Sequence, residues 1–138
     1  MRGLLLDTSV LIRAEREAVD VWDALLKVRE QTGATDVGVS TLTLMELAYG
    51  VVRADTESRR SSRQRFLSDV SRLLDVYPVT ASGATAAGIV EGELSLAGIR
   101  VATVDLLIGV TARELGFGIV THNLRHFERI PGLQVVSI

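Results

Sequence analysis

The feature that most constrains this 138-residue sequence is the alternation of very short apolar segments with longer stretches of helical period. Apolar side chains on both faces of a strand are typical of a parallel sheet that helices cover on both sides. We therefore expect an α/β fold with a central parallel sheet flanked by helices on both faces. The expected strands are 4–6, 37–39, 76–79, 117–120 and 133–136.

Polar caps and glycines indicate where the helices begin and end. Thr8 or Ser9 is expected to cap the first helix, and Ser40 the third. Pro78 places the third strand at an edge or at a strand end. The polar stretch 54–65 is expected to project into solvent. The other helices are expected at about 18–32, 82–97 and 104–115, ended by Gly33, Gly98 and Gly116.

Composition restricts the chain to one domain, expected to span 1–138, and to few kinds of chemistry. The absence of cysteine excludes thiol catalysis and thiolate metal sites, so a metal needs oxygen ligands or the two histidines, His122 and His126. Apolar tracts fall well short of the ~20 residues that span a bilayer. No secretory signal is recognisable, so we expect a cytoplasmic protein without membrane contact. The net charge of -2 argues mildly against nucleic acid as a partner.

Three acidic residues lie in apolar surroundings near the carboxyl ends of expected strands, where α/β folds place their sites. Asp7 follows Leu4–Leu6, Glu46 lies one turn into the helix after the second strand, and Asp105 opens a later helix. Each has a structural alternative: Asp7 and Asp105 could cap helices, and Glu46 could be a partly exposed helix residue or a partner for Arg53. The alternatives do not explain why all three map to one edge of the sheet.

Clustered carboxylates repel one another unless a cation neutralises them. Because Lys27 is the only lysine, a divalent metal is the simplest such cation. Ligands that are all oxygen favour Mg²⁺, with Mn²⁺ as a substitute. The fourth strand runs into Thr121-His122-Asn123, which adds polar groups at the same edge.

Four segments in order give the sequence a resemblance to PIN-domain ribonucleases, specifically the VapC-type toxins of type II toxin–antitoxin systems. The resemblance extends over residues 5–133, nearly the whole chain. The segments are Leu5–Ile12, Ser40–Gly50, Thr103–Gly109 and Val120–Phe127, the last followed by Ile130–Leu133.

The resemblance implies a Mg²⁺-dependent endoribonuclease that attacks a phosphodiester of RNA with a metal-activated water. It implies catalytic roles for Asp7, Glu46, Asp105 and Asn123, with Asp7 and Asp105 as metal ligands. The family often has Asp where this chain has Asn123, and an acid can then occur three residues later, where this chain has His126. That departure bears on the affinity for a second metal ion. The family also implies a homodimer and a cognate VapB-type antitoxin as inhibitor.

Neighbouring residues receive supporting roles. Thr8 and Thr121 are expected to orient the carboxylates. Ser9 is expected to serve as a local cap, and each histidine alone is expected at the surface or at a helix start. Arg13 and Arg125 are candidates for contacts to RNA phosphate.

Two features of the expected surface, an arginine cluster and a set of apolar stripes, can each be interpreted in two ways. The arginine cluster Arg53–Arg72 is either a solvated helical face balanced by acids or a track for RNA or antitoxin. The apolar stripes around Trp22 and Leu25, and around Leu47, Tyr49 and Val52, are either core or partner surfaces.

Two other functions stay open. A catalytically impaired PIN-like binding module is compatible with Asn123. A phospho-aspartate domain of the receiver or phosphatase type would use Asp7 as acceptor. The second is less favoured, because position 9 is Ser rather than Asp and no lysine occurs late in the chain.

Overall fold

The computed structural model describes residues 2–138 as five strands and six α-helices, with one 3₁₀ turn. No helix within those residues has the length and apolarity needed to cross a membrane. The strands are β1 (Leu4–Leu6), β2 (Val37–Ser40), β3 (Asp75–Tyr77), β4 (Gly118–Thr121) and β5 (Val135–Ser137). The helices are α1 (Thr8–Arg16), α2 (Val21–Thr32), α3 (Thr41–Val52), α4 (Glu57–Leu73), α5 (Ala81–Leu96) and α6 (Thr103–Glu114), with the 3₁₀ turn η1 at Leu124–His126.

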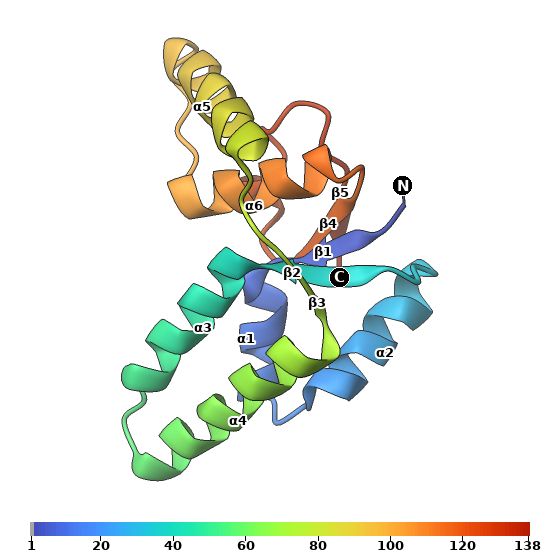
Figure 1. The fold of residues 1–138 in the computed structure, drawn as a ribbon, viewed down its shortest axis with the longest axis vertical. Coiled ribbons are helices and arrows are strands. Elements are labelled where there is room, and N and C mark those ends of the chain that lie inside the picture. The colour runs from blue at the N-terminus through green and yellow to red at the C-terminus, as the bar shows by residue number, and fades with distance from the viewer. Residues whose placement is uncertain (1) are drawn as a thin grey trace.

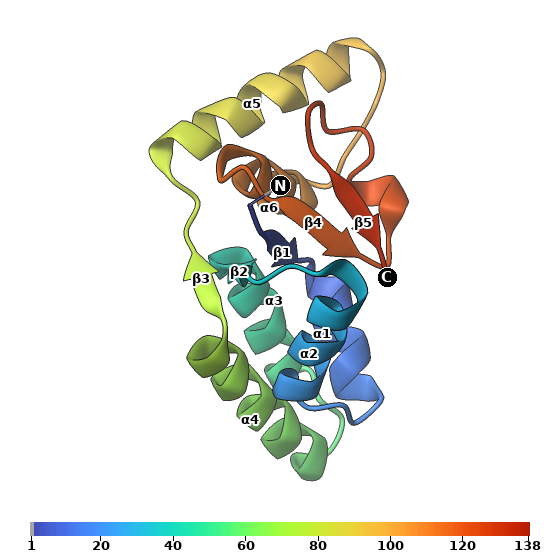
Figure 2. The same cartoon turned by 90° about the vertical axis from the view of Figure 1, so that its right-hand side faces the viewer.

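All strand pairs are parallel, and the strand order is β3-β2-β1-β4-β5. Helices α1 to α4 lie on one side of the sheet, whereas α5 and α6 lie on the other (Figures 1 and 2). The expected α/β architecture, with helices on both faces, is therefore confirmed.

Two apolar cores follow from the alternation of side chains along the strands. Leu4 and Leu6 of β1 and Val120 of β4 pack with helices α1 to α4. Ile119, the residue before Val120, packs instead with α5, α6 and Phe127. Because both faces of β1 and β4 are covered, residues that follow these strands are held at the edge of a rigid central layer.

The strand order reverses direction between β1 and β4, which makes this position the topological switch point of the sheet. The chain places β2 and β3 on one side of β1, and then crosses back to place β4 and β5 on the other side. Loops that follow two such neighbouring strands diverge and leave a crevice at the carboxyl edge of the sheet. Asp7 directly follows β1, and Thr121 is the last residue of β4.

Most element boundaries agree with the sequence-based expectation. Gly33, Gly98 and Gly116 have φ values of 73° to 75° at or just after helix ends, as expected. Ser40 caps α3 by accepting from the Leu42 N–H. Pro78 comes directly after β3, which is an edge strand.

The expected cap of the first helix was wrong. Asp7, not Thr8 or Ser9, is the N-cap residue of α1, and its side chain makes no capping hydrogen bond. Thr8 and Ser9 lie inside the helix, where their hydroxyl groups bond to other carboxylates. Strands β3 and β5 also start and end a residue or two away from the expected positions. Within 54–65, residues from Glu57 onward form the first turns of α4, and this part of the helix is mostly exposed as expected.

Candidate active site

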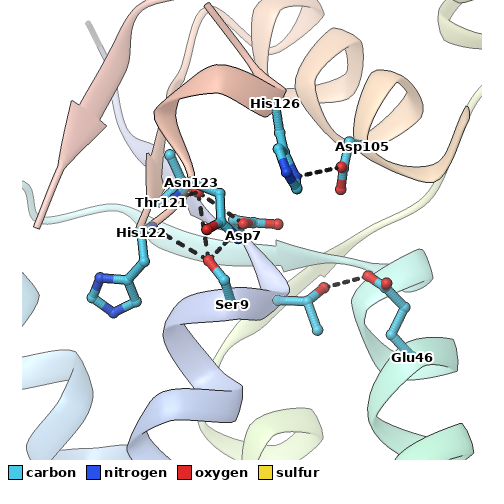
Figure 3. A network of polar contacts seen from close by, with 9 residues as sticks. Asp7, Ser9, Glu46, Asp105, Thr121, His122, Asn123 and His126 are labelled. Carbon is cyan, nitrogen blue, oxygen red and sulfur yellow. Dashed lines mark hydrogen bonds and ion pairs between the residues drawn. The ribbon is translucent and has the colours of Figure 1, made fainter. Parts of the chain in front are cut away.

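Asp7 is the buried centre of a polar network at the carboxyl edge of the sheet (Figure 3). Its side chain is 3% exposed, and its backbone N–H donates to the Val120 carbonyl at 2.9 Å. Its Oδ2 atom accepts hydrogen bonds from the hydroxyls of Ser9 at 2.7 Å and Thr121 at 2.8 Å. A buried carboxylate needs such donors, because burial without them is costly. Both donors use Oδ2, so they fix the direction in which Oδ1 points.

Two further backbone bonds tie this network to the loop after β4. The Asn123 N–H donates to Thr121 Oγ1 at 2.9 Å, and the His122 N–H donates to Ser9 Oγ at 3.3 Å. Thr121 thus accepts from the loop and donates to the acid. The loop that carries Asn123 is therefore positioned by the same groups that orient Asp7.

Glu46 reaches the site from α3 and is held by α1. Its Oε1 accepts from the Thr8 hydroxyl at 2.6 Å, and Thr8 lies 3.0 Å from the hydroxyl of Thr43. Both threonines are buried, with 4% and 0% exposure. Among residues 2–138, Glu46 forms no ion pair with Arg53, the alternative that its sequence left open.

Asp105 enters from the opposite side, in the first turn of α6. Ala102 is the N-cap residue of that helix, so Asp105 does not serve as its cap. The Asp105 Oδ2 atom lies 2.9 Å from His126 Nδ1 in η1. The side chain of Asp105 is 18% exposed, whereas that of His126 is 53% exposed. This contact joins α6 to the loop after β4 across the crevice.

The three acids influence one another electrostatically. Burial raises the pKa of Glu46, and the charges of Asp105 and Asp7 raise it further, while the Thr8 hydrogen bond partly opposes them. Burial also raises the pKa of Asp105, with a further increase from the charge of Asp7 and an opposing effect of His126. Carboxylates that repel one another in a partly buried crevice are a setting in which a bound cation is strongly favoured.

Comparison with known proteins identifies the family. The family model of the PIN domain matches residues 4–133. The chain belongs to the PIN-domain family. It is 32% identical over 135 residues to the tRNA(fMet)-specific endonuclease VapC of Shigella flexneri, covering 97% of this chain and 96% of that protein. It is 29% identical over 136 residues to ribonuclease VapC1 of Rickettsia felis, covering 99% of this chain and 96% of that protein.

Solved structures show the same fold. The VapBC complex of Salmonella typhimurium bound to DNA contains a chain that superposes with a TM-score of 0.79 and 28% identity, covering 99% of this PIN domain and 98% of that chain. A chain of the Rickettsia felis VapBC2 complex superposes with a TM-score of 0.82 over 98% of both chains, at 24% identity. The expected PIN fold and the VapC-type resemblance are both confirmed.

The donor set of this PIN domain fits a hard divalent cation. Nowhere in residues 2–138 do three His, Asp or Glu side chains converge closely enough to ligate one ion as they stand. Mg²⁺ does not require this, because it typically keeps several waters and binds through one or two carboxylates. Asp7 and Asp105, which repel each other, supply two carboxylates on facing sides of the crevice. The amide of Asn123 adds a neutral oxygen nearby.

Two contacts in the site were not expected from the sequence. Ser9 was interpreted as a local cap, but it donates to Asp7 and accepts from His122. His126 lies at the surface, as expected, but it also touches Asp105, which the sequence did not indicate. Its position three residues after Asn123 was the available signal, because the family can place an acid there. Thr121 was expected to orient a carboxylate and lies against Asp7, whereas Thr8 lies against Glu46.

The basic residues of the PIN domain fall into two groups. In the arginine cluster of α4, several members lie beside acids, which favours the solvated-face interpretation. The pairs are Arg59 with Asp55 at 3.4 Å, Arg60 with Glu57 at 3.8 Å, Arg63 with Glu15 at 3.8 Å and Arg72 with Asp69 at 2.9 Å. Arg13 and Arg125, in contrast, are exposed near the loop after β4.

The apolar stripes of the sequence are part core and part surface. Leu25 and Leu47 are buried, with 2% and 9% exposure. Trp22, Tyr49 and Val52 are 49%, 67% and 72% exposed, which is high for large apolar side chains. The exposed members of these stripes are therefore available to partners.

Proposed function

We propose that this PIN domain is a VapC-type endoribonuclease that hydrolyses RNA phosphodiesters with Mg²⁺ or Mn²⁺ as cofactor. The observation that carries the proposal is that Asp7 lies close enough to Glu46 and Asp105 for its charge to raise the pKa of both, while hydroxyl groups orient Asp7 and Glu46. The names of the relatives, ribonuclease and tRNA(fMet)-specific endonuclease, support the same activity. Initiator tRNA is therefore the first RNA to test.

The roles of the residues follow from their contacts. When bound, a divalent cation supplies polarisation of the scissile phosphate and activation of a water for in-line attack. Asp7 and Asp105 would hold the cation, and Thr121 and Ser9 fix the orientation of Asp7. Oriented carboxylates of this kind owe much of their metal affinity to such neighbouring hydrogen bonds.

Glu46 is assigned to the attacking water. Thr8 occupies Oε1 of Glu46, so Oε2 is the atom that can orient the water and accept its proton. The raised pKa of Glu46 makes its carboxylate a better proton acceptor than an exposed glutamate. Asn123 contributes an uncharged oxygen that can hold a water at the same edge. Arg13 and Arg125, which are exposed near the loop after β4, are assigned to contacts with phosphates of the RNA.

A VapB-type antitoxin is the proposed inhibitor, and a second copy of the chain is the proposed dimer partner. Structural neighbours in VapBC complexes support the first assignment. A hollow of about 100 Å³ beside Glu46 is walled by Ile12, Leu47 and Phe66, with Arg63 also lining it. It suits an apolar side chain of an antitoxin. The exposed Tyr49 and its α3 neighbours Met45 and Val52 suit a dimer contact.

The test compares the wild type with Asp7→Asn on initiator tRNA and on total cellular RNA, with cleavage sites mapped side by side. We expect discrete Mg²⁺-dependent cleavage that EDTA abolishes and that Asp7→Asn reduces by about a thousandfold or more, as expected for loss of transition-state stabilisation. Titration with Mn²⁺ should show binding to the wild type and weaker binding to Asp7→Asn.

Other results would identify the alternatives. Mn²⁺ binding without cleavage of any RNA would indicate an impaired binding module, which Asn123 leaves open. Transfer of phosphate from a small phosphodonor to Asp7 would indicate a phospho-aspartate domain. If Asp7→Asn cleaves RNA as well as the wild type, Asp7 is not required for the reaction.

A further inference from the structure

We infer that a single-stranded RNA segment leaves the acidic crevice over η1 and His122 and continues into the hollow between α1 and α2. This inference rests on the proposed ribonuclease function and assigns the course of its substrate. It adds Lys27 and His122 to the substrate-binding residues and excludes the arginine cluster of α4.

Two hollows on the surface share His122 and together extend from the crevice. One, of about 330 Å³, lies over η1 and is lined by Asn123, Leu124, Arg125 and His126 as well as His122. Its His126 is the residue that touches Asp105, so this hollow lies beside the acidic site. In the proposed course, the RNA passes from the acids to His122 over this hollow.

The second hollow, of about 200 Å³, continues from His122 between α1 and α2. Its lining includes Arg13 of α1 and Lys27 and Gln31 of α2. Apolar groups such as Val10 and Ala24 form part of its wall. Together the two hollows give one path whose walls carry basic side chains among apolar ones.

The cations along this path are not neutralised by neighbouring acids. Arg13, Lys27 and Arg125 are exposed, and none pairs with a carboxylate of residues 2–138. Glu17 is the one acid that lines the second hollow. The path thus carries three cations that lie beside no acid, and one acid, whereas Arg59, Arg60, Arg63 and Arg72 each lie beside an acid. Cations without an acidic neighbour attract phosphates more strongly than cations that are paired.

His122 is held in place by contacts that leave most of the Arg13 donors free. Its backbone N–H donates to Ser9, which also donates to Asp7, so the residue is fixed relative to the acidic site. Its Nδ1 lies 2.9 Å from the backbone oxygen of Ile138 and 3.3 Å from Arg13 Nη1. The Arg13 guanidinium has five N–H donors, so the donors that do not face His122 stay available to a phosphate.

The path matches single-stranded rather than duplex RNA. Unpaired bases can turn toward the protein, whereas the bases of an A-form duplex are enclosed. Leu124 is 41% exposed between Arg125 and His122, and offers an apolar contact for an unpaired base. Sites for single-stranded nucleic acid combine basic side chains that bind the phosphates with apolar or aromatic side chains that contact the bases.

The experiment removes the three free charges together, in the variant Arg13→Ala/Lys27→Ala/Arg125→Ala. Binding of a labelled single-stranded RNA of ~12 nucleotides is measured in EDTA by fluorescence anisotropy at several salt concentrations. Each phosphate contact contributes about 0.7 to the slope of log affinity against log salt. We expect the slope to fall by about 2 in the triple variant, and cleavage with Mg²⁺ to show a raised KM.

The matched control is Arg59→Ala/Arg60→Ala/Arg72→Ala, which removes the same charge from exposed arginines that lie beside acids. Its salt slope is expected to equal that of the wild type, and a duplex of the same length is expected to compete poorly for the path. Three results would each overturn the inference. The salt slope of the path variant could be unchanged, the α4 control could lose as much slope as the path variant, or the duplex could compete as well as the single strand. Absence of RNA cleavage by the wild type would instead contradict the ribonuclease function, so the two failures are distinguishable.

Discussion

Replacing Thr121 by valine tests whether the hydroxyl network around Asp7 maintains the site. Valine keeps the shape of threonine but removes the hydroxyl, which donates to Asp7 at 2.8 Å and accepts from the Asn123 N–H at 2.9 Å. Thr121 is fully buried, so no bulk water replaces the hydroxyl. The change therefore removes two hydrogen bonds without creating a cavity.

The magnitude follows from those two bonds. A hydrogen bond to a charged group contributes about 1.5–3 kcal/mol, and an ordinary one about 1 kcal/mol. We expect the free energy of unfolding of the metal-free protein to fall by about 2–4 kcal/mol. Loss of a group that orients a metal-ligating carboxylate typically costs about 10- to 100-fold in metal affinity, and we expect that reduction for Mn²⁺.

Urea unfolding in EDTA measures the stability, and isothermal titration measures Mn²⁺ binding. Thr121→Ser, which keeps the hydroxyl, is the control and should retain most of both properties. Ser9→Ala combined with Thr121→Val completes a double-mutant cycle. Because both hydroxyls donate to the same Oδ2, the two effects should not add. Wild-type stability and Mn²⁺ affinity in Thr121→Val would refute the proposed role of the network.

Two further changes test the electrostatics and the packing of the site. A pKa that is raised in the folded state means that ionised Glu46 lowers the free energy of unfolding. The contribution of protonated Glu46 to stability is complete below the ordinary pKa of 4.5 and is lost as the pH rises through the pKa of the folded state. Glu46→Gln should therefore stabilise the metal-free protein against urea at pH 7 but not at pH 4, and an equal effect at both pH values would contradict this explanation. Gly109→Ala would place a Cβ 2.5 Å from Ile130 Cδ1 and 3.3 Å from Phe127, at an overpacking cost of about 1–3 kcal/mol. Thermal unfolding should show this loss and its partial recovery in Gly109→Ala/Ile130→Val, which removes the clashing methyl; no recovery would mean that the cost has another origin.

The local part of the fold could be predicted from the sequence, because it depends on near neighbours. Leu4–Leu6 followed by Asp7 indicated a buried strand with an acid at its end, and the glycines after α2 and α6 indicated the helix ends. The first cap was wrong for a tertiary reason. The Thr8 hydroxyl has a stronger acceptor in Glu46, which is 38 positions away in the sequence.

The rest of the site depends on contacts that sequence spacing does not reveal. Ser9 lies beside Thr121 only because β1 and β4 are neighbours across the switch point. His126 reaches Asp105 because α6 packs closely on the segment after η1, at Gly109, where a side chain would clash with Ile130. These contacts need the strand order and the helix packing, which a list of motifs does not supply.

The net charge of -2 becomes compatible with an RNA substrate once the charges are placed on the fold. Three of the acids belong to the crevice, where a divalent cation would offset part of their charge. On α4, three exposed arginines lie beside acids, which weakens the attraction of those arginines for phosphate. Along the two hollows that share His122, Arg13, Lys27 and Arg125 form no ion pair with a carboxylate of residues 2–138. An RNA strand responds to this local arrangement rather than to the total, so a slightly acidic chain can still attract phosphate to the place where hydrolysis occurs.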